Sequence, residues 1–205
     1  MLIDLKVDDF VKQTAAASPV PGGGSVSALA GALAAALSAM VASLSMGKKG
    51  DDAGDTEMER LLSRAGALQQ VLTKAVDRDV MAYDTFLTAL KLPKRTPAEK
   101  DSRQREMQAA IRKISEVPLA VAESALEVLH LAAATAEKGR KDIVTDAAVA
   151  VLLSRAAVRG ALYNLKFNLR SLKDDAYVQE SLRQAAEMEK AAEEKEKSVL
   201  AVIGL

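Results

Sequence analysis

The chain has 205 residues, of which 49% are hydrophobic and only 3% aromatic, and its 28 acidic and 28 basic residues balance. This length allows one domain with a substantial core, and zero net charge gives no global field that would favour nucleic acid. The lack of cysteine excludes disulfides, thiolate catalysis and Cys-ligated metals. The chain has a single histidine, His130, which excludes a His-rich metal site, and we expect this histidine in the core. Alanine and leucine dominate, and alternating apolar and polar stretches are nearly absent, which predicts an all-α protein.

The first predicted helix covers residues 4–17, with Val7, Phe10 and Val11 facing inward. The start of the chain lacks the pattern of a secretory signal, so we expect a cytoplasmic protein. Residues 18–24 read Ser-Pro-Val-Pro-Gly-Gly-Gly. They end this helix because proline fixes φ and glycine adopts backbone conformations closed to other residues.

The next predicted helix starts at Ser25 as its N-cap, ends near Gly47 and is uncharged over residues 25–46. A helix of this length spans roughly 30 Å, which is enough to cross a bilayer. Yet eight of these residues are alanine and five are serine, so the segment is only weakly hydrophobic. We therefore predict that this segment is the buried central helix of an up-and-down bundle or of a dimer interface and does not enter a membrane. A membrane-spanning helix is the alternative.

The following helix is expected to begin after a polar loop over residues 50–55. Thr56 and Glu59 have the spacing of a capping box that opens it, and Leu92 with the proline after it marks its end. No composition break divides the chain at this loop or elsewhere. We therefore treat residues 1–205 as a single helical domain.

Thr96 and Glu99 form a second capping box, which opens a helix that runs to about Glu116, and a restarted piece continues to Lys138 and closes at Gly139. Pro118 is expected to kink or restart this helix, since proline removes one backbone donor. A further helix is predicted over residues 145–172. Asp174 or Asp175 then caps a last, charge-rich helix with a solvated face.

Asp79 places a carboxylate where the helical pattern calls for an apolar side chain. At about 100° per residue, it lies in the middle of one helix face. The apolar members of that face are Leu72, Ala75, Val76, Tyr83, Phe86 and Leu90. A buried carboxylate must be paired, hydrogen-bonded or protonated, so Asp79 is a candidate functional residue; the alternative is a structural aspartate held by Arg or Lys of a neighbouring helix.

Two other aspartates are weaker candidates. Asp77 lies about 160° from Asp79 around the helix, and it is solvated if only one side of the helix is buried. Asp146 has an ordinary explanation as a first-turn acid favoured by the helix dipole. Carboxylates alone suit Mg²⁺ or Ca²⁺, but the chain has no EF-hand-like loop, so we predict no metal site.

The turn Gly22-Gly23-Gly24-Ser25 opens a helix and is a candidate anion-binding arrangement, because unpaired N–H groups point outward from a helix start. It matches neither a P-loop nor a dinucleotide-binding fingerprint, and the alternative is a tight connection with no further role. Asn164 and Asn168, four residues apart, share a helix face. They could read the edge of a heterocycle or simply satisfy each other and the backbone.

Several blocks resemble the cyclodeaminase/cyclohydrolase family, which occurs fused to formiminotransferase in a bifunctional animal enzyme and as stand-alone bacterial folate enzymes. The first block runs from Ser18 through the three glycines and ends in Met-Gly-Lys-Lys at residues 46–49. The later blocks are Asp77-Arg78-Asp79 with Tyr83 and Phe86, Leu92-Pro93-Lys94, Val117-Pro118-Leu119, Thr145-Asp146-Ala147, and Asn164 with Asn168. The resemblance covers about residues 8–175. It departs from the family pattern at Thr145, which keeps the usual hydroxyl, and at Arg78 and Arg140, which leave the preference between substrates open.

The resemblance implies an enzyme acting at the N5–N10 bridge of tetrahydrofolate. A cyclodeaminase closes 5-formimino-tetrahydrofolate to the 5,10-methenyl form with release of ammonia, and a cyclohydrolase opens the methenyl form to 10-formyl-tetrahydrofolate. We slightly favour the cyclodeaminase. Either reaction needs a carboxylate that shuttles a proton beside a cation, and neither needs a cofactor beyond the folate substrate.

The resemblance also suggests roles for individual residues. Asp79 is the expected acid/base, with Asp77 and Asp146 as further candidates. Asn164 and Asn168 would hold the pterin edge, Lys48 and Lys49 the glutamyl tail, and residues 22–25 a carboxylate or a pterin carbonyl. A homodimer with active sites near its interface is implied as well. A non-catalytic helical assembly protein is the remoter alternative.

Overall fold

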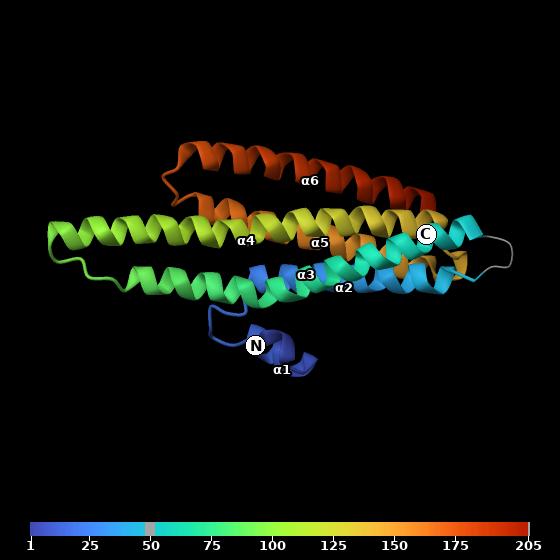
Figure 1. Ribbon diagram of the computed structural model, residues 1–205, viewed down its shortest axis with the longest axis horizontal. Coiled ribbons are helices and arrows are strands. Elements are labelled where there is room, and N and C mark those ends of the chain that lie inside the picture. The colour runs from blue at the N-terminus through green and yellow to red at the C-terminus, as the bar shows by residue number, and fades with distance from the viewer. Residues whose placement is uncertain (48–51, 205) are drawn as a thin grey trace.

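The computed structural model describes residues 1–47 and 52–204, and across these residues it is all-α, as the composition predicted. The elements in chain order are η1 (Leu2–Asp4), α1 (Val7–Thr14), α2 (Gly23–Ser45), α3 (Asp52–Leu90), α4 (Pro97–Lys138), η2 (Lys141–Ile143), α5 (Val144–Leu169) and α6 (Asp175–Ile203). Helices α2 to α6 run alternately up and down along one long axis, and α1 lies outside them (Figure 1). The predicted up-and-down bundle is confirmed.

Helix α2 is the central helix of this bundle, as its small side chains predicted. It packs against α3, α5 and α4. Ala28, Ala35 and Ser38 are fully buried, and a Cβ on Gly31 would lie 3.2 Å from Leu72. Small residues thus allow the close approach of neighbouring helices that a uniformly buried helix requires.

Among the described residues, two helices, α2 and α4, are long and apolar enough to cross a membrane by length and composition alone. The core helix of a soluble protein meets the same criterion. More than half of the apolar window of α2 is buried inside the bundle. Its contacts on several sides therefore agree with the role of a core helix.

Several predicted helix ends need correction. Gly22, not Ser25, is the N-cap of α2. Helix α3 already begins at Asp52, so Thr56 lies inside it and residues 52–55 of the predicted polar loop are helical. The capping box of Thr96 and Glu99 is confirmed, with the Glu99 backbone N–H donating to Thr96 Oγ1 at 3.2 Å.

Helix α4 continues through Pro118 without a restart, because a hydrogen bond from a neighbouring helix compensates for the one that proline cannot make. Asp174 caps α6 by accepting from the Tyr177 backbone N–H at 3.1 Å. His130 is exposed and lies near Lys195 of α6, so its predicted place in the core was wrong.

The prediction for α1 is wrong in part. Phe10 packs against the core, but Val7 is 82% exposed and Val11 is 59% exposed. The apolar face of α1 lies over the outer face of α2 and leaves an open apolar groove that includes Val26 and Leu33. The helix lies outside the bundle rather than within it, and for this reason its apolar residues stay accessible in the single chain.

Candidate active site

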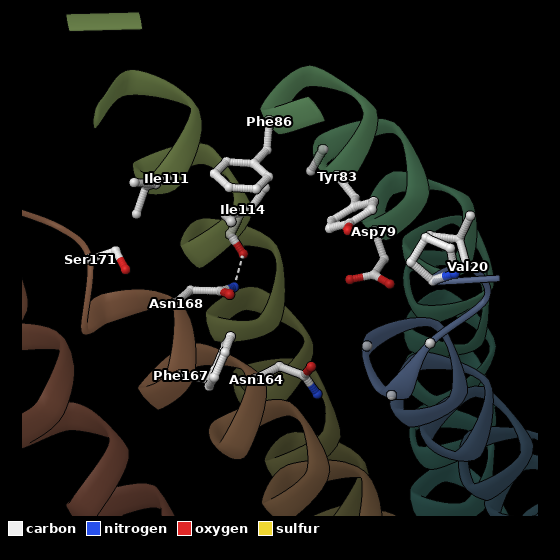
Figure 2. Close-up of a pocket in the computed structure, with 15 residues that line it drawn as sticks. Val20, Asp79, Tyr83, Phe86, Ile111, Ile114, Asn164, Phe167, Asn168 and Ser171 are labelled. Atoms are coloured by element: carbon white, nitrogen blue, oxygen red, sulfur yellow. Dashed lines mark hydrogen bonds between the residues drawn. The ribbon is translucent and has the colours of Figure 1, made fainter. Parts of the chain in front are cut away.

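A cavity of about 360 Å³ opens where the first turn of α2 meets α3, α4 and the end of α5 (Figure 2). Its walls are Pro19, Val20, Gly22, Gly23, Gly24, Asp79, Ala82, Tyr83, Phe86, Ile111, Ile114, Asn164, Phe167, Asn168 and Ser171. The structure therefore brings together the glycine turn, Asp79 and both asparagines. Among these residues Asp79 is the only one with a charged side chain.

Asp79 is half-buried and held by the start of α2. The Ser25 hydroxyl lies 2.9 Å from Asp79 Oδ2 and 3.1 Å from the carbonyl oxygen of Val76, and it donates toward both acceptors. Burial raises the pKa of Asp79, and the hydrogen bonds from the Ser25 side chain and backbone N–H offset part of that rise. No described Arg or Lys forms an ion pair with it, so the purely structural alternative of a salt-bridged aspartate is wrong.

Gly24 is required for this close approach, and Gly23 lies tight against Asn164. A Cβ on Gly24 would lie 2.1 Å from Asp79 Oδ1, and a Cβ on Gly23 would lie 3.3 Å from Asn164 Nδ2. Any larger residue at position 24 would displace the carboxylate. The positive end of α2 is thus directed at a carboxylate of the protein itself, which also places Ser25 in contact with the site.

The two asparagines are each fixed through the nitrogen of the carboxamide. Asn164 Nδ2 donates to the carbonyl oxygen of Gly160 at 2.8 Å. Asn168 Nδ2 donates to the carbonyl oxygen of Ile114 at 2.8 Å, the bond that Figure 2 draws as a dashed line. They do not bond to each other. No described residue donates to either carboxamide oxygen, so both oxygens remain available to a ligand.

Three of the six Phe and Tyr residues of the chain line the cavity. Tyr83 and Phe86 come from the face that carries Asp79, with ring centroids 6.2 Å apart. Phe167, which the sequence interpretation missed, lies beside Asn168 and is 68% exposed. Its position between two asparagines was the available signal. For Ile111 and Ile114 the sequence held no signal of a place in the cavity, because it does not say which face of α4 meets α5.

The remaining candidates lie elsewhere. Asp77 is buried rather than solvated: its Oδ1 accepts from the Leu2 backbone N–H at 2.6 Å, so it holds the N-terminal segment, outside the cavity. Asp146 is in the first turn of α5, about 27 Å along the helix axis from Asn164. Lys48 and Lys49 lie outside the described residues. No group of three or more His, Asp or Glu among the described residues is placed to hold a metal ion.

The fold and the cavity together define a class: an all-α bundle protein with one carboxylate, two carboxamides and three aromatic rings in a single cleft. The family model for formiminotransferase-cyclodeaminase matches residues 6–187. This chain therefore belongs to that family.

Individual relatives agree with this family assignment. The chain is 36% identical over 178 residues to the methenyltetrahydrofolate cyclohydrolase of Methylorubrum extorquens, covering 87% of this chain and 86% of that one. It is 36% identical over 176 residues to the formimidoyltransferase-cyclodeaminase of Rattus norvegicus, covering 86% of this chain but only 32% of the rat enzyme. The crystal structure of formiminotetrahydrofolate cyclodeaminase from Thermotoga maritima superimposes with a TM-score of 0.88 at 26% identity, covering 99% of this chain and 98% of that one. The family resemblance is confirmed.

Proposed function

We propose that this protein is a folate one-carbon enzyme that acts at the N5–N10 bridge of tetrahydrofolate, with 5-formimino-tetrahydrofolate cyclodeaminase as its reaction. The relatives named above act as cyclodeaminases or as a cyclohydrolase. The observation that carries the proposal is the isolation of Asp79, the only charged side chain among the described residues of the cavity wall, between aromatic rings and carboxamides. A single carboxylate in such surroundings suits one proton transfer next to a cationic carbon.

The chemistry follows from that placement. N10 attacks the carbon of the protonated formimino group, the new C–N10 bond forms as the C=N bond becomes single, and the ionised Asp79 takes the proton that N10 loses. The protonated Asp79 then gives this proton to the amino nitrogen on the tetrahedral carbon. The C–N bond to that nitrogen breaks, ammonia leaves, and the 5,10-methenyl cation remains beside a carboxylate that stabilises its charge.

Ser25 suits both protonation states of this carboxylate. When Asp79 is ionised, the Ser25 hydroxyl donates to Oδ2. When Asp79 is protonated, the same hydroxyl can turn fully to the Val76 carbonyl oxygen, 3.1 Å away, and leave its lone pairs facing the acid. The raised pKa of Asp79 brings it closer to the pH at which a carboxyl group both accepts and donates a proton efficiently.

The alternative is 5,10-methenyl-tetrahydrofolate cyclohydrolase, which the Methylorubrum relative favours. Asp79 would then take a proton from the water that attacks the methenyl carbon and deliver it to N5 as the C–N5 bond breaks. The hydroxyl left on the carbon loses its proton to solvent as the formyl C=O forms, giving 10-formyl-tetrahydrofolate. The same residues serve both reactions. The choice depends on whether the site admits water or a formimino nitrogen at the bridging carbon.

For substrate binding, we assign the pterin to the cavity between the aromatic residues and the asparagine pair. The exposed ring of Phe167 and the Tyr83–Phe86 pair supply flat apolar surfaces, and Asn164 and Asn168 face its edge. Residues 22–25 would contact a carboxylate or carbonyl group, and Lys48 with Lys49 would meet the glutamyl tail. We propose no cofactor beyond the tetrahydrofolate substrate and a cytoplasmic location.

We also propose a homodimer. Val26, Leu33, Met40 and Leu44 of α2 share a face within about 40° and are all exposed. Val149 and Leu152 of α5, a helix that packs against α2, are exposed as well. An apolar surface of this extent favours a partner, and a second copy of the chain is the one the family suggests. Light scattering over a dilution series tests it, and a stable, active monomer would contradict it.

One experiment tests the function. Purified protein is incubated with 5-formimino-tetrahydrofolate and, separately, with the 5,10-methenyl form, while methenyl absorbance is followed. Absorbance that rises in the first incubation identifies the cyclodeaminase, and a fall above the uncatalysed rate in the second identifies the cyclohydrolase. Protein that changes neither rate and binds neither folate would instead support the non-catalytic assembly protein.

A further inference from the structure

We propose that Pro118 is a positioning residue of the folate site. Pro118 leaves the Ile114 carbonyl oxygen without its helical partner, and Asn168 donates to that oxygen instead. This bond fixes the Asn168 carboxamide so that its own oxygen is available to an N–H donor of the ligand. This inference rests on the proposed function and goes beyond it, because it assigns a role to a residue that does not line the cavity. It also explains why α4 carries a buried proline in its interior.

The first step is backbone chemistry. In a regular helix the N–H of residue 118 would donate to the carbonyl oxygen of residue 114, but proline has no N–H and its ring pushes that carbonyl aside. Ile114 would then have a carbonyl without a helical partner next to the cavity. Asn168 Nδ2 of α5 fills this vacancy at 2.8 Å. The lost intrahelical bond is thus replaced by a bond between two helices.

The second step concerns the orientation of Asn168. The acceptor is a backbone carbonyl, so the nitrogen of the carboxamide must face it. Inverting the carboxamide would bring Asn168 Oδ1 against the Ile114 carbonyl oxygen, which is repulsive. The bond therefore selects one of two carboxamide orientations that are nearly equal in shape.

The third step concerns what the cavity then recognises. Asn164 is held in the same sense, through Nδ2 to the carbonyl oxygen of Gly160. The two oxygens have no described donor of their own and belong to side chains that line the cavity with Asp79, so they are available to a ligand there. A ligand with N–H donors along one edge, such as an aminopteridine, complements this set of acceptors, whereas an edge made of carbonyl groups does not.

The test compares Pro118→Ala with Pro97→Ala in the full-length protein. Pro97 is at the first position of the same helix, where a missing N–H costs nothing. In Pro118→Ala the new N–H competes for the Ile114 carbonyl. We expect KM for the active folate to rise about fivefold, kcat to stay within about twofold, and the urea midpoint to stay the same or increase. Pro97→Ala should leave KM unchanged.

A double-mutant cycle and a spectroscopic measurement complete the test. Asn168→Ala should raise KM by a clearly smaller factor in the Pro118→Ala background than in the parent protein; factors that simply multiply would overturn the proposal. The ¹⁵N–¹H side-chain resonances of Asn168 should shift in Pro118→Ala without any folate present, and unchanged resonances would also overturn it. If the parent protein binds no folate, the proposed function fails, but this resonance still tests the Pro118–Asn168 link. Pro118→Ser, which restores the same N–H, replaces the alanine variant if that variant does not fold.

Discussion

The hydroxyl of Ser25 donates to Asp79 across 54 positions of sequence, at 2.9 Å. This contact joins the first turn of α2 to the middle of α3. It explains why serine follows three glycines: the glycines let the turn approach, and the serine then bonds the carboxylate.

Ser25→Ala removes one of the two hydrogen bonds that lower the pKa of Asp79, while burial, which raises it, remains. The pKa of Asp79 should therefore rise further. Since the ionised carboxylate starts the reaction, the acidic limb of the profile of kcat/KM against pH should move to higher pH. A profile that coincides with that of the parent enzyme would show that Ser25 does not control this ionisation.

Asp79→Asn should reduce kcat by about 10²–10⁴-fold, the usual contribution of a positioned acid or base, because the amide cannot take up a proton. Folate affinity, measured by fluorescence titration, should change little because the side chain keeps its shape. Near-normal turnover of this variant would refute the assignment of Asp79.

Asp79→Asn should lower activity but raise the stability of the fold. Burial raises the folded-state pKa of Asp79 above its unfolded value of 3.8. The stabilising contribution of this group is therefore complete below the unfolded pKa and is lost as pH rises through the raised pKa. Urea unfolding should show Asp79→Asn gaining stability over the parent between acidic and neutral pH. A difference that shrinks over this range would contradict the sign.

Gly24→Ala should abolish most activity, because a Cβ there would lie 2.1 Å from Asp79 Oδ1 and one of the two must move. Gly66→Ala is the matched control. Gly66 lies inside α3, and a Cβ added to it would meet nothing within 4 Å, so alanine should keep kcat and stabilise the helix by about 0.5–1 kcal/mol. Equal loss of activity in both variants would point to a general effect of substitution rather than to the carboxylate.

Asp77→Asn should keep kcat within about threefold of the parent, because Asp77 bonds Leu2 and does not line the cavity. The amide oxygen can still accept from the Leu2 N–H. Steady-state kinetics of this variant beside Asp79→Asn separates the two aspartates. A loss as large as that of Asp79→Asn would place Asp77 in the chemistry after all.

Much of the fold followed from local chemistry. The small, uncharged residues of α2 indicated a buried central helix, and the Thr96–Glu99 spacing placed the start of α4 correctly. Predictions failed where a tertiary contact outweighed a local one. Ser25 has the chemistry of an N-cap, but its hydroxyl bonds Asp79 instead, and Val7 and Val11 have a core pattern on a helix that lies outside the bundle.

The sequence by itself determined the all-α class and the central helix, and it singled out Asp79 as a candidate, because a carboxylate on an apolar helix face is visible from periodicity alone. Only the tertiary structure decided which residues meet it. The register between α4 and α5 brings Asn168 to the carbonyl that Pro118 frees, and the packing of α3 turns Asp77 toward Leu2 and Asp79 toward the cavity. Such pairings depend on how whole helices pack, and helix packing satisfies many side chains at once rather than any single local pattern.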